Sequence, residues 1–176
     1  MLKGQYVGLR AIEKDDLPIL LQWRNQPEYR QFFREYRELN SVNQEKWFAN
    51  KVLGDPGTIM FTIVDLVDNK VLGACGLCYI DWINRNADFS IYIGDKNVYI
   101  DDKYAPDAAK VMMKYGFKEL NLHRLWTELY DFDTKKIEMF QKLGFVQEGR
   151  HRETHWTDGN WCDSVYFSML SADLGR

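Results

Sequence analysis

Apolar residues alternate, or recur at helical spacing, along most of the chain, and this pattern predicts its strands and helices. Strands are predicted at residues 6–12, 60–66, 71–80, 87–93 and 125–130, and the tail at about 147–170 is predicted to form a hairpin around residues 158–160. Helices are predicted from an entry at residues 13–17 to an end near residues 25–27, from 41 to about 53, from about 106 through 115, and from 133 to Gly144. The order is strand, two helices, three strands, helix, strand, helix and two strands.

This order is typical of an α/β (α+β) domain with a mostly antiparallel sheet flanked by helices. The chain has 176 residues, of which 45% are apolar and 15% aromatic, and it contains only four prolines. Such a length leaves little room for two cores, and such a composition argues against disorder. We therefore expect residues 1–176 to form a single domain.

The charge balance disfavours several classes of partner. The chain has 23 Lys and Arg against 26 Asp and Glu, which gives a formal net charge of −3. This balance supplies no field for binding nucleic acid or an anionic membrane. No apolar run approaches the ~20 residues that a bilayer requires, and residues 1–8 lack the apolar core of a signal peptide. We expect a cytoplasmic protein with its three cysteines as thiols.

Two motifs invite a metal or redox interpretation that their spacing disfavours. Cys75 and Cys78 are three apart on a predicted strand and would point to opposite faces, and no second Cys-x-x-Cys exists to complete a zinc site. His151 and His155 would share a face of a strand but lie ~13 Å apart at ~3.3 Å per residue. We expect no metal. No Gly-x-Ser-x-Gly or Walker-type loop occurs either.

The aromatic and charged stretch from Trp23 to Arg37 has two open interpretations. It could be a mobile loop over an edge of the core, or a substrate-binding wall in which aromatic rings supply shape and Glu35 or Arg37 supplies charge. Functional residues often lie on loops held by rigid elements.

The whole chain resembles the GNAT N-acetyltransferases, in particular the RimJ/RimL-type branch. The resemblance rests on the shared order and spacing of residues 7–11 with 15–17, 23–25, 71–73, 87–94, 120–126, and 140–145 with 148–149. It implies the GNAT fold, whose mixed sheet is split by a V-shaped cleft that holds acetyl-CoA. The family transfers acetyl directly to an amine.

The resemblance also implies a coenzyme site that is altered in this chain. The family's diphosphate loop aligns with residues 100–105, where only Ala105 fits and Lys103 replaces the central glycine. Pro106 removes one N–H donor, and Asp101, Asp102 and Asp107 add negative charge, unless they serve to stabilise the helix N-terminus. The coenzyme-binding residues implied are Ile91, Ile93, Lys103, Tyr104, Ala105, Asp133 and Phe140.

The implied catalytic groups are also only partly present. Phe140 stands where many members have a tyrosine that protonates the thiolate, a change common in the RimJ/RimL branch, and Asp133 replaces an asparagine near the pantetheine. Asp88 aligns with a position where some members keep a glutamate base, so it is the candidate base. The alternative is an edge-strand aspartate facing solvent.

We therefore expect an acetyl-CoA-dependent N-acetyltransferase that acts on a primary amine of a small molecule or a protein N-terminus. Amino sugars on nucleotide carriers, polyamines and protein N-termini all remain open as acceptors. The alternative is a GNAT-fold binding or regulatory protein without activity, and the oligomeric state is left as monomer or homodimer. The candidate acceptor-binding residues are Trp23, Arg24, Asn25, Phe33, Tyr36 and Tyr79, and Tyr92 and Tyr130 are further candidates for lining the cleft.

Overall fold

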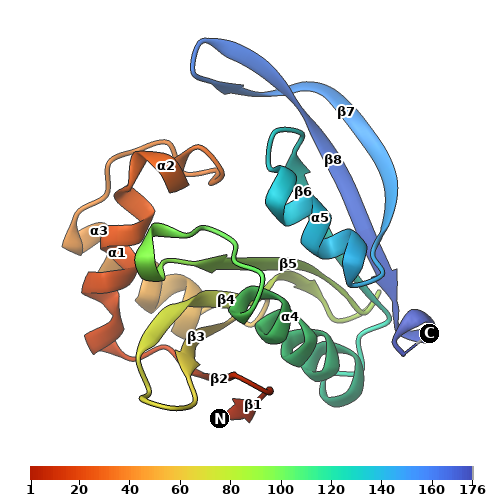
Figure 1. Cartoon of the computed structure of the whole chain (residues 1–176), viewed down its shortest axis with the longest axis horizontal. Helices are drawn as coiled ribbons and strands as arrows, with labels where there is room; N and C mark the ends of the chain where they lie inside the picture. The colour runs from red at the N-terminus through yellow and green to blue at the C-terminus, as the bar shows by residue number, and fades with distance from the viewer. Residues whose placement is uncertain (176) are drawn as a thin grey trace.

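One sheet of eight strands organises the chain (Figure 1), in a computed structural model that describes residues 1–175. Its spatial order is β1-β2-β3-β4-β5-β6-β8-β7, and every neighbouring pair is antiparallel except β5 and β6, which are parallel. The strands are β1 Leu2–Lys3, β2 Val7–Ala11, β3 Ile59–Asp65, β4 Val71–Asp81, β5 Asn86–Ile93, β6 Arg124–Tyr130, β7 Val146–Thr157 and β8 Asn160–Leu170. The predicted GNAT fold, with its mixed and mostly antiparallel sheet, is confirmed; among the strands, only the short β1 was not predicted.

Helices cover this sheet at the predicted places, and the short α2 Pro27–Arg30 is an additional helix that was not predicted. The predicted helices are α1 Leu17–Asn25, α3 Ser41–Trp47, α4 Tyr104–Lys114 and α5 Thr134–Lys142. The π-helical segments Phe48–Leu53 and Tyr115–Glu119 continue α3 and α4, and short 3₁₀ turns occupy Lys14–Asp16, Asp95–Asn97 and Ser171–Asp173. Helix α4 begins two residues before the predicted start at Pro106, and its first amides, those of Tyr104 and Ala105, donate hydrogen bonds to the Asp101 carboxylate. No helix within residues 1–175 combines the length and apolar character needed to cross a membrane.

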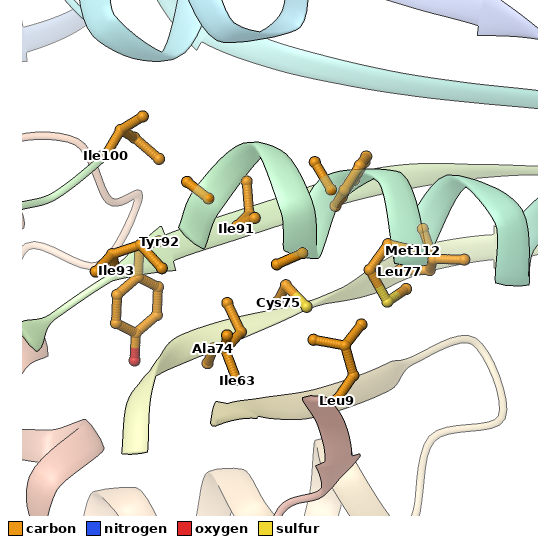
Figure 2. Packing of buried hydrophobic residues seen from close by; sticks show 14 of the residues in the cluster. Leu9, Ile63, Ala74, Cys75, Leu77, Ile91, Tyr92, Ile93, Ile100 and Met112 are labelled. Atoms are coloured by element: carbon orange, nitrogen blue, oxygen red, sulfur yellow. The ribbon is translucent and has the colours of Figure 1, made fainter. Parts of the chain in front are cut away.

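The hydrophobic core packs side chains of α1, α4 and α5 against the central strands. Figure 2 shows Ile91 of β5 beside α4 while the neighbouring Tyr92 points away, as alternation along a strand requires. Cys75 is fully buried in this core, whereas Cys78 is partly exposed and its Sγ lies 3.8 Å from the Sδ of Met60. The two thiols thus have separate surroundings. Burial raises the pKa of both, that of Cys78 to about 12, so neither is a reactive thiolate at neutral pH.

The two histidines of the hairpin β7–β8 are also apart. The strand register shifts between His151 and His155, and Glu153 between them has a left-handed φ of 53°. The expectation that side chains alternate regularly between the two faces of the strand from His151 to His155 is therefore wrong. The His155 ring stacks on Tyr130 with 3.7 Å between ring centroids, and His151 packs on Tyr166. Among the described residues no group of three or more possible metal ligands converges.

Candidate active site

The sheet opens between its two parallel strands. Only three residue pairs join β5 to β6, and the last of them is Asp88 with Trp126. Beyond that pair β5 continues to Ile93 and β6 to Tyr130, and within residues 1–175 the register contains no further pairing between them. This is the V-shaped split expected of the fold. A cavity of about 440 Å³ adjoins it, lined by α1, α3, β4, β5, β6, α5 and residues 32–35.

Asp88 lies where the two strands part, and its side chain lines the cavity. It is only 8% exposed, so the alternative of a solvent-facing aspartate is wrong. Burial raises the pKa of Asp88 to about 6, although the positive charges of Arg34 and Lys136 act in the opposite direction. A carboxyl group with this pKa is mostly ionised at neutral pH and is a stronger base than an exposed aspartate.

Arg34 reaches into the split from the loop after α2. Its guanidinium donates a hydrogen bond to Glu128 Oε2 at 2.9 Å and lies 3.8 Å from the Asp88 carboxylate. Glu128, on β6, also accepts a hydrogen bond from the Ser164 hydroxyl at 2.7 Å. One arginine therefore connects the aromatic loop to both diverging strands. The Arg34 guanidinium also lies 6.0 Å from the ring centroid of Tyr79.

The charged residues of that loop match the expectation in part, because Glu35 lines the cavity and Arg37 is not among its lining residues. Glu35 accepts two hydrogen bonds from the Arg37 guanidinium, at 2.7 and 2.8 Å, so these two side chains neutralise each other. Arg34, which the pattern did not single out, supplies the charge at the strands instead. Neither Arg34 nor Glu128 could be identified from sequence spacing, because 94 positions separate them.

A second buried group of polar side chains lies at the start of α5. The Lys136 ammonium donates a hydrogen bond to the Tyr99 hydroxyl at 2.8 Å, and Tyr99 is hydrogen-bonded to the Asp133 carboxylate. Lys136 lines the cavity yet is only 7% exposed. Burial lowers the pKa of Lys136 and raises that of Asp133. Asp133 caps α5 as predicted, because it accepts a hydrogen bond from the Lys136 amide.

Lys136 was missed by the sequence analysis although a signal existed. Lys136, Met139, Phe140 and Leu143 lie three or four positions apart, so they share the inward face of α5. A lysine on the apolar stripe of an otherwise amphipathic helix is a candidate for a buried charge. Its neighbour Lys135 is exposed.

Two of the predicted coenzyme residues are part of the core or already hydrogen-bonded. Phe140 is completely buried against Phe89 and Phe145, with ring centroids 5.4 and 4.8 Å away, and is not among the side chains that line the cavity. The Ile93 amide donates to the Tyr99 carbonyl at 2.8 Å. Alternate amides of a strand face the same edge, so the Ile91 amide also faces the split, where no β6 residue in the described chain pairs with it. This strand edge suits the pantetheine arm of a coenzyme.

The N-terminus of α4 fits a diphosphate less well. The Asp101 carboxylate accepts hydrogen bonds from the amides of Lys103, Tyr104 and Ala105 at 3.1, 2.8 and 2.8 Å. These amides are the donors that a helix N-terminus would offer to phosphate, and Pro106 has none. The Lys103 ammonium lies 4.5 Å from the centroid of the Tyr104 ring and remains exposed. A bound diphosphate must therefore displace or avoid the Asp101 side chain.

Asp107, whose charge was expected near the diphosphate, is occupied elsewhere. Its carboxylate accepts hydrogen bonds from the backbone amides of Gln5, Tyr6 and Val7 at 3.1, 2.7 and 3.0 Å. It therefore fastens the turn between β1 and β2 to α4.

The predicted acceptor-binding residues divide into two groups of three. Arg24, Phe33 and Tyr79 line the cavity, as does Tyr92. Trp23, Asn25 and Tyr36 are not among the lining residues of this cavity. Trp23 is 6% exposed and packs edge-on against Tyr92. The Asn25 side chain is hydrogen-bonded to both the backbone carbonyl and the backbone amide of Leu39. Tyr36 is 84% exposed. Tyr130, also proposed for the cleft, is buried under His155.

Comparisons with known proteins agree with the architecture. The acetyltransferase (GNAT) domain family matches residues 7–146. The chain is 25% identical over 174 residues to the uncharacterized N-acetyltransferase p20 of Bacillus licheniformis, covering 98% of this chain and 97% of that protein. It is 28% identical over 165 residues to the spermidine N(1)-acetyltransferase of Escherichia coli K12, covering 94% and 86% of the two chains.

The fold also matches solved structures. The crystal structure of spermidine N-acetyltransferase from Vibrio cholerae in complex with CoA and spermine superposes with a TM-score of 0.85 at 24% identity, covering 95% of this chain and 96% of that one. Placement in the RimJ/RimL branch stays a prediction, and the alternative of a protein without transferase activity is not retained. The chain belongs to the GNAT acetyltransferase family, and it is an acetyl-CoA-dependent N-acetyltransferase.

Proposed function

We propose that the protein acetylates the primary amine of a small molecule and that Asp88 accepts the proton which this amine must lose. The observation that supports the proposal most directly is the position of Asp88. It is the last paired residue before the strands diverge, it is buried, and its carboxylate lines the cavity. The raised pKa of Asp88 suits a general base at neutral pH.

The reaction requires a balanced exchange of bonds and protons. The neutral amine forms a bond to the acetyl carbon, the bond between that carbon and sulfur breaks, and the sulfur leaves as a thiolate. Asp88 takes the proton of the amine, directly or through water. Arg34 lies beside Asp88 and holds Glu128, so it limits how much negative charge collects at this point.

The departing thiolate must be stabilised or protonated by a side chain other than Phe140. Phe140 has no proton to donate and is sealed in the core. Lys136 is the buried cation that lines the same cavity as Asp88, and burial lowers its pKa from that of an ordinary lysine. Its ammonium therefore gives up a proton more readily than an exposed lysine does, and we assign it the role of stabilising or protonating the thiolate.

The size of the cavity favours a small acceptor over a protein N-terminus. The cavity volume of about 440 Å³ lies within the range of about 300 to 1,000 Å³ typical of small-molecule sites. Arg34 also lines this cavity, and its hydrogen bond to Glu128 joins the loop after α2 to β6. Two of the relatives named above acetylate spermidine, so polyamines belong among the acceptors to be tested.

An acceptor screen tests the proposed function. Purified protein with acetyl-CoA is offered polyamines, amino sugars and their phosphates, aminoglycosides and short peptides with free N-termini. Product mass and CoA release are followed together. We expect at least one small-molecule amine to gain a single acetyl group and the peptides to remain unmodified. Acetylation of the peptides alone would contradict the small-molecule assignment.

The pH dependence of kcat/KM should reveal the titration of Asp88. The base must be ionised to act, so the rate is expected to fall as the pH drops below about 6, the pKa of Asp88 in the fold. Measurements from pH 4.5 to 8 should show a limb with unit slope below that pKa. The limb should be missing from the residual activity of Asp88→Asn. A wild-type profile that stays flat through pH 6 would remove Asp88 from this role.

Removing the charge of Asp101 should strengthen acetyl-CoA binding. Asp101→Asn keeps an oxygen that can cap α4 but no longer places a carboxylate on the amides of residues 103–105. We expect the Kd for acetyl-CoA to fall by about tenfold, equivalent to ~1.4 kcal/mol. Isothermal titration of both proteins measures this, with Asp102→Asn as the matched control. Equal affinities would mean that the diphosphate does not meet Asp101.

A further inference from the structure

Gln44 is a buried side chain whose hydrogen bonds are missing. It lies on α3, is 1% exposed and lines the cavity. Neither its amide oxygen nor its amide nitrogen has a partner among the described residues. Burying a primary amide without partners is unfavourable, so a side chain kept in this state is expected to meet its partners in a ligand. A glutamine amide offers one acceptor and two donors, which matches polar oxygen groups.

Arg24 provides a positive charge at the same cavity, where it also acts on the Glu35 carboxylate. Its guanidinium lies 5.6 Å from the centroid of the Trp47 ring, and Trp47 follows Gln44 by three positions on the same face of α3. Within residues 1–175 the structure gives Arg24 neither a hydrogen bond nor a salt bridge, and its side chain is only partly exposed. A guanidinium fixed on an aromatic ring with its donors free is suited to a carboxylate or phosphate.

The carboxylates around the cavity are by contrast already compensated. Glu35 is held by Arg37, and Glu128 is held by Arg34, which also lies beside Asp88. Each of the three lining carboxylates of the described chain, Glu35, Asp88 and Glu128, has an arginine within salt-bridge distance, and the contact of Asp88 is the longest at 3.8 Å. A polyamine would present two or more ammonium groups to this cavity. Only one of them could be met by Asp88, and the others would face paired acids and the positive charge of Arg24.

From these contacts we infer that the acceptor is an amine that also carries an oxyanion, a carboxylate or a phosphate, bound by Arg24 and Gln44 over the Trp47 ring. This inference rests on the proposed function, because it assigns the acceptor of the same site. The amine end faces Asp88 and the oxyanion end faces α1 and α3. The selectivity against polyamines follows from charge, since Arg24 attracts an oxyanion and repels an ammonium.

Matched amines test the inference by both binding and turnover. Glucosamine, glucosamine 6-phosphate, ethanolamine, phosphoethanolamine and spermidine are titrated calorimetrically into the CoA-loaded protein and assayed with acetyl-CoA. We expect the anionic member of at least one pair to bind and react at least tenfold better than its neutral partner. Arg24→Met should reduce that preference to less than twofold, and Lys46→Met, which removes an exposed cation of α3, should leave it intact.

A second variant separates recognition from folding. Gln44→Met replaces the unpaired amide by an apolar side chain, so its melting temperature should rise while the affinity for the anionic amine falls about tenfold. Spermidine as the best ligand, with Arg24→Met unchanged, would overturn the inference and leave the acetyltransferase assignment standing. Binding of no anionic amine in the panel would overturn it as well. Failure to bind acetyl-CoA would contradict the proposed function itself.

Discussion

Replacing Asp88 with asparagine is expected to lower kcat by about 10² to 10⁴-fold, the range typical for loss of a general base. The amide has nearly the same size and can still occupy the apex of the split, but it cannot accept the proton of an ammonium. The measurement is steady-state kinetics with the acceptor that the screen identifies. Asp15→Asn, at an exposed position outside the cavity, is the control. A loss of less than threefold for Asp88→Asn would assign the proton transfer elsewhere.

The same variant should be at least as stable as the original protein, which separates a chemical defect from a folding defect. Burial raises the pKa of Asp88 from 3.8 to about 6, so the fold disfavours its ionised form. The ionised carboxylate therefore costs stability above pH 6, by up to about 3 kcal/mol for a shift of roughly two units. That cost declines as the pH falls from 6 towards 4. Urea unfolding at pH 7.5 should show no loss for Asp88→Asn.

The fold could be predicted from the sequence because its strands and helices carry their own local signals. The pairs β3–β4 and β7–β8 follow from alternation with a turn between, and α5 follows from an N-cap and helical spacing. The split between β5 and β6 could be predicted only from the resemblance to GNAT proteins. Nothing in the local pattern of β5 says that its pairing with β6 stops at Asp88.

The side chains that define the cavity were harder to predict because their roles depend on contacts between distant segments. Gln44 is a polar residue on a helix of mostly exposed residues, and only the packing of α3 reveals that its amide is buried without partners. Arg34 acquires its role from a β6 residue 94 positions away. Asp101 was identified correctly as a negative charge near the start of α4. The sequence did not show that its carboxylate accepts hydrogen bonds from three backbone amides, because this depends on the path of the chain before the helix.

Replacing Lys136 with methionine is expected to lower kcat by about 10²-fold. The methionine fills a similar volume, but it leaves the Tyr99 hydroxyl and the buried Asp133 carboxylate without the ammonium that Lys136 supplies, so stability is expected to fall as well. A purely structural lysine would lose stability in the same way, but kcat of the folded protein would change little. Lys135→Met, at the exposed neighbouring position, is the matched control for helix propensity and net charge.

The pH profile of Lys136→Met distinguishes a group that acts on the reaction from one that only fills space. In the original protein the positive charge of Lys136 lowers the pKa of Asp88, so its removal should shift the acidic limb of kcat/KM to higher pH. If Lys136 is also the proton donor, the original enzyme loses rate at high pH as this ammonium is deprotonated, and the variant has no such decline. An unchanged acidic limb together with an unchanged kcat would contradict both roles, because a charge facing Asp88 across one cavity cannot be removed without altering its titration.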